Sequence, residues 1–437
     1  MQLKKVIERI FPQSTHSVFR GMAALLTGAG LARLVSLGSV PILTRMYSPT
    51  DYGTLAVFTA AVTVSAPLIN LRFAQAIPLP KSDRLAVRLA AAAFVSTLAV
   101  SLLLATTLSI GSDTVFGWIS MPTLATWWWL VVLGAAGISA YEILATWATR
   151  KRAYRVLART TVTQSVLGET VKLALGMAGV KPLGLLLGQL ANQGAGLTTL
   201  FIAFKSDLTR LNADLTFKKI ARAAALYAEY PTLRLPSHLL LIMAMQAPVV
   251  LSANFFTAGE AGQLGLALMT LAVPVALIGD SMSRAFYAEI SAMGRNRGPE
   301  IKALTLALVK RLLIIAIPCS LAFLLLGQWL FTTAFGDQWL LAGKLASVLS
   351  IYLATQFIQK PVSYILFVFD GQRQLLLINI QRLVLAVGTF YGAHALDLSI
   401  VETIAVYSVA LSVHYLASIV LAIRLIPSPP TNSTNDE

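Results

Sequence analysis

Long apolar stretches, each bounded by charged or turn-forming residues, recur along the whole chain. A stretch of about 20 apolar residues is long enough to cross a bilayer as a helix. The stretches are continuously apolar and lack the alternation that a membrane β-barrel requires, so they predict an all-α integral membrane fold. The twelve expected transmembrane helices cover residues 18–46, 53–78, 85–108, 123–147, 154–179, 182–204, 229–256, 264–290, 303–328, 338–367, 373–393 and 399–424.

Every second connection between these spans is basic. Lysine and arginine collect before the first span and around residues 81–88, 150–155, 205–222, 295–302, 373 and 424, whereas the intervening connections carry few, Lys181 being the main exception. Cytoplasmic loops carry an excess of lysine and arginine. The alternation therefore predicts that both termini are cytoplasmic and that the number of spans is even.

The two halves of the chain share a series of landmarks in the same order. The landmarks are a proline, an acid followed two residues later by glycine, and an arginine: Pro41, Asp51 and Arg72 in the first half, and Pro248, Glu260 and Arg284 in the second. We expect six spans in each half, with the same orientation in the membrane and a central cavity between the two lobes. A chance match between two hydrophobic sequences is the alternative.

This repeat suggests a division of the chain into five parts. They are a cytoplasmic interfacial segment (1–17), an N-lobe (18–204), a cytoplasmic linker (205–228), a C-lobe (229–424) and a disordered cytoplasmic tail (425–437). The interfacial segment alternates apolar and basic positions at helical spacing, as helices that lie on a membrane surface do.

Composition excludes several functional classes. The chain of 437 residues is 57% hydrophobic and 12% charged, against roughly 25% charged in globular proteins. Its net charge of +15 would suit a nucleic-acid binder, but such a protein would not carry repeated apolar spans, so no nucleic-acid partner is expected. One cysteine and four scattered histidines predict no metal site. The sequence has no nucleophile elbow, metal-ligand histidine spacing or nucleotide-binding motif, so the chain is either a carrier or an enzyme whose site has no recognisable motif.

Charged residues inside the spans need a reason, because a charge at the bilayer centre costs roughly 2.5 to 3.5 kcal/mol on insertion scales. Glu169 and Lys172 are spaced i, i+3, and Asp280 and Arg284 are spaced i, i+4, so each pair can close on one helix face. A structural salt bridge is the simpler interpretation of both pairs. A role for the two acids in ion coupling is the alternative.

Glu142 is a further acid within a span. The other deep charges, which these pairs leave unmatched, are positive. Arg33, Arg72, Lys360 and Arg382 have no obvious counter-ion nearby in the sequence. Uncompensated buried cations are unfavourable, and a bound anion would relieve them. Arginine is suited to bidentate contact with phosphate. The sequence therefore predicts a cargo that carries phosphate or carboxylate. The candidate binding residues are Arg33, Arg72, Arg284, Arg382 and Lys360.

Three runs of residues resemble the sequence signatures of a known family. Residues 36–53 (SLGSVPILTRMYSPTDYG) resemble the opening signature of Wzx-type polysaccharide-export flippases of the multidrug/oligosaccharidyl-lipid/polysaccharide (MOP) exporter superfamily. Residues 71–81 and 184–189 resemble the family's second signature and its sixth helix. Family members often carry an acid where this chain has Gln75, which weakens the case for acid-based ion coupling at that position.

The resemblance implies a function as well as a fold. It implies two six-helix lobes in a V, and alternating access for an undecaprenyl-diphosphate-linked glycan crossing the bacterial inner membrane. It also implies participation in O-antigen or exopolysaccharide assembly, together with membrane lipids and other polysaccharide-assembly proteins. No cofactor is implied, although coupling to a proton or sodium gradient through Asp280 or Glu169 is an option.

Three competing interpretations stay open. A multidrug or metabolite antiporter of the same superfamily is the nearest, but export of organic cations favours acidic cavities. A glycosyltransferase or polymerase would need a sizeable outer loop with acids or histidines, and the outer loops here are short. A scaffold for an envelope-synthesis complex would leave the deep cations unexplained.

Overall fold

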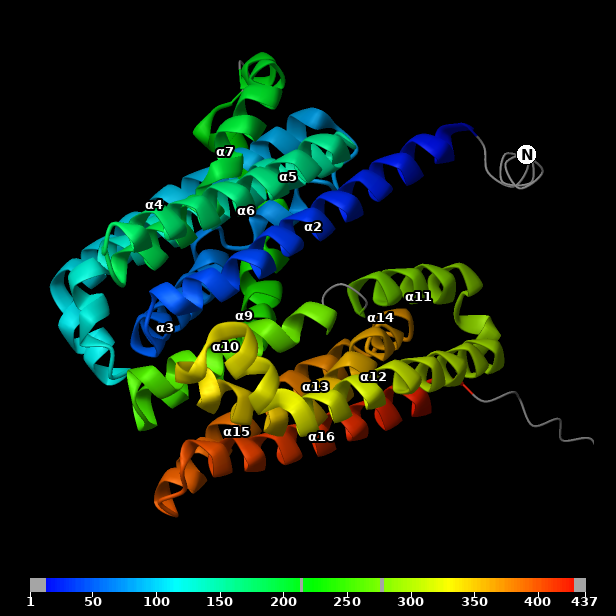
Figure 1. Ribbon diagram of the computed structural model, residues 1–437. Helices are drawn as coiled ribbons and strands as arrows, with labels where there is room; N and C mark the ends of the chain where they lie inside the picture. Colours follow the sequence, from blue (N-terminus) through cyan, green and yellow to red (C-terminus); the bar gives the residue numbers. More distant parts are fainter. Residues whose placement is uncertain (1–12, 213–214, 276–278, 428–437) are drawn as a thin grey trace, which may run out of the picture. The chain divides into compact units, whose positions relative to one another are not determined.

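The computed structural model describes residues 13–212, 215–275 and 279–427, and this part of the chain is helical without any strand (Figure 1). The prediction of an all-α fold is confirmed. The expected interfacial segment falls mostly on residues 1–12 and the expected tail mostly on residues 428–437, and both of these ranges lie outside the described residues.

The chain divides into two compact units, residues 1–242 and 243–437. The elements of the first are α2 (Gln13–Met46), α3 (Pro49–Ile69), η1 (Phe73–Ala76), α4 (Asp83–Trp118), η2 (Pro122–Trp127), α5 (Trp128–Arg150), α6 (Tyr154–Met177), α7 (Leu183–Asn212), α8 (Phe217–Leu226) and η3 (Tyr230–Arg234). The boundary between the units falls within α9 (Leu235–Phe255).

The second unit continues from α9. Its elements are α10 (Ala258–Pro274), α11 (Asp280–Met293), η5 (Arg295–Arg297), α12 (Gly298–Phe335), η6 (Asp337–Trp339), α13 (Leu340–Val362), α14 (Ile365–Val368), α15 (Gln372–Ala395) and α16 (Ile400–Arg424). The expected linker, residues 205–228, holds the last turns of α7 and the whole of α8, which packs against α4 of the first unit.

Each of the twelve expected spans contains helical residues, although the span expected at 53–78 continues beyond the end of α3 at Ile69. Within the described residues, eight segments are long and apolar enough to cross a membrane. The helices α2, α6 and α7 are not among them, because their sequences are richer in polar positions such as Glu169 and Lys172 of α6. The span expected at 264–290 is divided, since α10 ends at Pro274 and α11 begins at Asp280.

A buried ion pair lies where α2, α6 and α7 pack side by side (Figure 1). Lys172 Nζ lies 3.0 Å from Glu169 Oε1, and the hydroxyl of Ser39 donates a 2.8 Å hydrogen bond to Glu169 Oε2. The expected salt bridge of Glu169 and Lys172 is therefore confirmed. A Cβ atom added to Gly188 of α7 would overlap the side chain of Lys172. Glycine at this position lets the helices approach closely, as small residues do in membrane bundles.

The second unit packs around α13. This helix contacts α10, α12 and α16, and its buried residues continue into an apolar core with Phe286 of α11 and Ile378 of α15. The closest approach is to α12, where a Cβ atom on Gly343 would come 2.6 Å from the Cα atom of Gln328.

The repeated acids of the two halves are helix caps. Ser48 and Asp51 form a capping box at the start of α3, and Thr257 and Glu260 form the same motif at the start of α10. In each box the hydroxyl accepts from the backbone of the acid and the acid accepts from the backbone of the capping residue. The sequence repeat therefore has a local structural counterpart. Both acids in it accept hydrogen bonds from the backbone at the start of their own helix.

The pair of Lys172 and Glu169 provides a test of packing. In the variant Lys172→Met, the 5% exposed Glu169 would lose its cation, and breaking a buried pair costs about 3–5 kcal/mol. In the double variant Lys172→Met/Glu169→Leu, both charges are replaced by apolar groups of similar size, so most of this loss should be recovered. Thermal unfolding of purified protein in detergent measures both effects. A double variant no more stable than the single variant would contradict the assignment.

Candidate functional site

The chain breaks its helical path directly after α3. Leu71 and Arg72 both adopt left-handed backbone conformations, with φ of 49° and 62°, before the short helix η1 begins. Such conformations in residues other than glycine cost on the order of 1–3 kcal/mol each and persist only when the surroundings hold them. Here the side-chain oxygen of Asn70 accepts a 2.8 Å hydrogen bond from the backbone N–H of Arg72.

Glu142 of α5 joins the side chains of this segment. Its Oε2 atom accepts a 2.8 Å hydrogen bond from Asn70 Nδ2, and its Oε1 atom lies 3.7 Å from Arg72 Nη1 and 3.4 Å from Gln75 Nε2. The expectation that Arg72 has no nearby counter-ion is wrong, because the counter-ion comes from a distant helix. Gln75 donates to Glu142, and an acid at this position would repel the carboxylate.

The pairing of Arg72 is incomplete. Its side chain is 11% exposed and that of Glu142 is 26% exposed. The buried Nε atom of Arg72 has no hydrogen-bond partner among the described residues. A guanidinium group carries five N–H donors, and one long ion pair to a partly exposed carboxylate leaves donors for an anion. Arg234 of η3 adds positive potential here, but it is more than half exposed and is paired with Glu229 at 3.4 Å.

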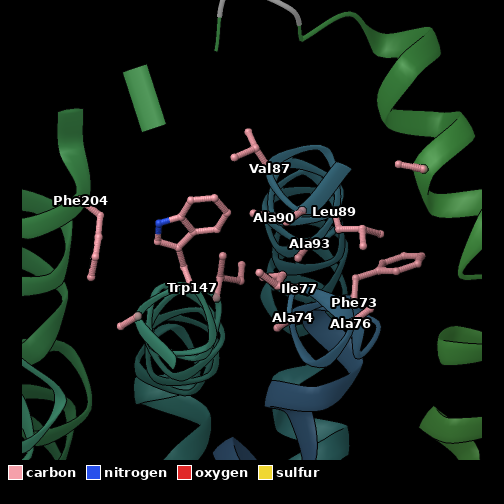
Figure 2. Close-up of a cluster of buried hydrophobic side chains, with 14 of the residues drawn as sticks. Phe73, Ala74, Ala76, Ile77, Val87, Leu89, Ala90, Ala93, Trp147 and Phe204 are labelled. Carbon is pink, nitrogen blue, oxygen red and sulfur yellow. The ribbon is translucent and has the colours of Figure 1, made fainter. Parts of the chain in front are cut away.

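The segment that carries Arg72 packs against a buried apolar cluster. Figure 2 shows Phe73, Ala76 and Ile77 beside Val87, Leu89 and Ala90 of α4, with the indole of Trp147 of α5 in the same buried cluster. Trp147 is 1% exposed. A site whose support is packed in this way keeps its geometry.

Arg150, one turn beyond Trp147, anchors the loop that follows η1. Its guanidinium donates to the carbonyl oxygens of Pro80 at 2.6 Å and Pro78 at 3.2 Å, and to Oδ1 of Asp83 at 2.8 and 3.0 Å. Lys151 Nζ binds the other oxygen of Asp83 at 2.7 Å. The run of residues 71–81 that resembles a family signature is therefore fixed at its far end by α5.

The other candidate cations are distributed over both units. Arg33 is exposed on α2, and Arg284 is exposed on α11. Lys360 is half-buried in the last turn of α13. Asp280 begins α11, and its side chain lies outside the described ones, so its pairing with Arg284 stays a prediction. The repeat relates Arg72 to Arg284 in sequence, but one is buried in a backbone break and the other lies on a helix surface.

Arg382 of α15 is 7% exposed and faces aromatic rings. Its guanidinium lies 5.4 Å from the ring centre of Tyr415, which in turn lies 5.7 Å from Tyr352. Gln356 donates to both tyrosine hydroxyls, at 3.3 and 3.2 Å. None of the ion pairs between described side chains includes Arg382. A cation–π contact and polar hydroxyls stabilise this arginine within its own unit.

Glu142 and Asn70 contact Arg72 or its counter-ion but were not among the predicted binding residues. Glu142 stands out in the sequence as an acid within a span, and this signal could have found it. Asn70 carries no such signal, because its role depends on the break after α3. Among the residues predicted to bind the cargo, Arg72 is the one that the described contacts place in a polar cluster with an acid.

The comparisons with known proteins identify a family and a fold. A model of the family described as polysaccharide biosynthesis protein matches residues 42–343, well over half of the chain. No curated protein sequence matches significantly. The matched region contains residues 71–81 and 184–189, the two runs that resemble the second signature and the sixth helix of the flippase family.

Solved structures of transporters share the fold. The lipid II flippase MurJ in an inward closed conformation aligns with a TM-score of 0.71 at 12% identity, over 92% of this chain and 88% of that one. An inward-facing multidrug resistance MATE family transporter of the MOP superfamily aligns with a TM-score of 0.60 at 14% identity, over 92% and 94%. A MOP superfamily transporter from Pyrococcus furiosus aligns with a TM-score of 0.54 at 14% identity, over 94% and 95%. The chain therefore has the all-α membrane fold of MOP superfamily transporters and belongs to the polysaccharide biosynthesis protein family.

Proposed function

We propose that this protein is a flippase. It moves an undecaprenyl-diphosphate-linked oligosaccharide from the cytoplasmic to the periplasmic leaflet of the bacterial inner membrane by alternating access, for O-antigen or exopolysaccharide assembly. The family supports a role in polysaccharide biosynthesis, and the shared fold with a lipid II flippase supports a lipid-linked cargo. The alternating basic loops support cytoplasmic termini.

The observation that carries this proposal is the incompletely paired Arg72. A lipid diphosphate has a headgroup that cannot cross hydrocarbon unaided, whereas its prenyl tail can stay in lipid. The headgroup therefore needs donors at membrane depth. Arg72 offers such donors in a fixed orientation. Glu142 binds one side of the guanidinium, and the Nε atom has no hydrogen-bond partner among the described residues.

Arg33 of the first unit and Arg284 of the second are further contacts for an anion in this proposal, each considered within its own unit. Each is exposed on a helix within a span expected from the sequence, and a cation that faced hydrocarbon would cost roughly 2.5 to 3.5 kcal/mol. A water-filled cavity removes this cost, so the energetics favour helix faces that line the transport path. Lys360 and Arg382 are weaker candidates, since Arg382 is enclosed by tyrosines within its own unit.

An ion gradient is not required by this mechanism. With a negative cell interior, outward movement of an anion is favoured by about 2.3 kcal/mol per charge per 100 mV. Glu169 already has Lys172 as its partner, which favours a structural role for it. A role of Asp280 in proton or sodium coupling stays a prediction.

The first prediction separates anion binding from packing at Arg72. The variant Arg72→Ala should lose both stability and transport, because it removes the donors and leaves Glu142 without its cation. In Arg72→Ala/Glu142→Gln, the amide still accepts from Asn70, so the thermal midpoint should recover while transport stays at least tenfold below that of the wild type. Transport is measured in liposomes as exposure of a labelled undecaprenyl-diphosphate oligosaccharide to a membrane-impermeant reagent.

The control is Arg297→Gln, which removes an exposed arginine paired with Glu300 and should change neither quantity. If the double variant recovers transport together with stability, the pair of Arg72 and Glu142 is purely structural. If the wild-type protein exposes none of the labelled lipid but exchanges organic cations for protons, the antiporter interpretation replaces the flippase.

The second prediction concerns the exposed arginines. Arg33→Gln and Arg284→Gln should each lower transport severalfold while leaving the thermal midpoint within about 2 °C of the wild type, because substitutions of exposed residues usually change stability by less than about 0.5 kcal/mol. The same liposome assay and a thermal melt of each variant test this. Normal transport by both variants would remove these residues from the proposed anion path.

A further inference from the structure

The carboxylate of Glu142 is itself an anion at the Arg72 site. Its Oε1 atom lies 3.7 Å from Arg72 Nη1, which is too long for a hydrogen bond but close enough to compensate the charge of the guanidinium. An anionic cargo would offer the same compensation, so the cargo and the carboxylate compete for one cation. The empty site and the loaded site therefore differ in which anion neutralises Arg72.

Glu142 is the more accessible partner of this pair. Its side chain is 26% exposed, against 11% for that of Arg72, and the Nε atom of Arg72 is buried. An anion that approaches through the accessible part of the site therefore meets the carboxylate first. It binds the guanidinium only when Glu142 moves aside or loses its charge, because two negative groups that share a site disfavour each other.

The hydrogen bonds around Glu142 suit a carboxyl group in either charge state. Asn70 Nδ2 donates to Glu142 Oε2 at 2.8 Å, and the orientation of this amide is fixed because its oxygen accepts from the backbone N–H of Arg72. Gln75 Nε2 lies 3.4 Å from the other carboxylate oxygen, a long hydrogen bond that constrains Gln75 weakly. An amide carries both donors and an acceptor. Gln75 can therefore donate to the carboxylate or, turned over, accept from the carboxylic acid.

Other titratable groups of the first unit lie near this pair. Those that interact electrostatically with Arg72 belong to η3 and to the first turn of α9, and they are Tyr230, Arg234 and His238. Arg234 is paired with Glu229 at 3.4 Å, and both side chains are more than half exposed. His238 is half-buried. A proton taken up at this site near neutral pH would therefore go to Glu142 or to His238, and mutation separates the two.

We propose that the diphosphate of the cargo replaces Glu142 as the counter-ion of Arg72, and that Glu142 takes up a proton when it gives up this role. The exchange rests on the proposed function, because it places the cargo anion at Arg72. In the empty site the carboxylate neutralises the guanidinium. In the loaded site the diphosphate does so, and the carboxyl, protonated from water, stays hydrogen-bonded to Asn70 and Gln75.

The exchange keeps the site compensated in both states. The empty protein leaves no uncompensated cation at membrane depth, where one is unfavourable, and the loaded protein does not hold a carboxylate against a diphosphate. Linkage then requires that the anion and the proton each make binding of the other tighter. The affinity for diphosphate should therefore rise as the pH falls, until Glu142 is protonated in the empty site as well.

The test is binding of farnesyl diphosphate, a short-chain prenyl diphosphate, to the full-length protein in phosphatidylcholine nanodiscs, with empty nanodiscs subtracted. Isothermal titration calorimetry in buffers of different ionisation enthalpy measures both the affinity and the protons taken up. At pH 8, Glu142→Gln should bind severalfold more tightly than the wild type and take up fewer protons, because its amide keeps the bond from Asn70 but carries no charge. The difference in affinity should shrink at pH 5.5. Comparing the two proteins at one pH cancels the protons exchanged by the diphosphate itself.

Three further variants serve as controls. Glu300→Gln removes an exposed carboxylate from α12 of the second unit and should match the wild type in both measurements. His238→Gln should keep the proton uptake of the wild type. Gln75→Glu adds a second carboxylate beside Glu142, so it should weaken binding at pH 8 and make binding more dependent on pH. This variant decides the outcome if Glu142→Gln melts abnormally.

The possible results separate the exchange from the proposed function. Weaker binding by Glu142→Gln with unchanged proton uptake would show that the carboxylate only positions Arg72, and it would overturn the exchange. Proton uptake lost in His238→Gln but kept in Glu142→Gln would assign the proton to the histidine and would overturn it too. Both results leave diphosphate binding at Arg72 intact. Binding that is unchanged in Arg72→Ala/Glu142→Gln would instead remove the anion site on which the exchange and the proposed function both rest.

Discussion

Charge inside a bilayer has to be compensated by the protein, because the hydrocarbon offers neither water nor counter-ions. The first unit meets this constraint in two different ways. Lys172 is compensated closely, by Glu169 at 3.0 Å, with Ser39 satisfying the second oxygen of the carboxylate. Arg72 is compensated loosely, by Glu142 at 3.7 Å, and its Nε atom has no hydrogen-bond partner among the described residues. The difference separates a closely paired cation from one with an unpartnered donor, and the proposed anion site rests on the second.

The backbone around Arg72 explains why this cation is not closely paired. Two left-handed residues place the guanidinium at the end of a broken helix, and the apolar cluster around Trp147 together with the hydrogen bonds of Arg150 keeps the break in place. A side chain on a regular helix could rotate towards the nearest acid on its own face. Here the position of the guanidinium is set by the packed segment, so the ion pair stays long and some donors stay available.

The two halves of the chain share local structure but use their charges differently. The capping boxes at the starts of α3 and α10 are equivalent, yet Arg72 lies in a backbone break whereas Arg284 lies on the surface of α11. In the second unit the buried cation is Arg382, which tyrosines rather than a carboxylate surround among the described residues. The two halves therefore compensate their buried cations in different ways.

Hydropathy and helical spacing were enough to predict the all-α membrane fold and the salt bridge of Glu169 with Lys172. These features depend on residues close together in sequence, where length, composition and an i, i+3 spacing determine the outcome. The tertiary structure decided which cations are compensated. Glu142 reaches Arg72 only because α5 packs beside the break after α3, and Arg382 is enclosed only because α15 packs against the tyrosines of α13 and α16. Burial and the choice of a counter-ion from a distant helix are properties of packing, and a pattern read along one helix does not contain them.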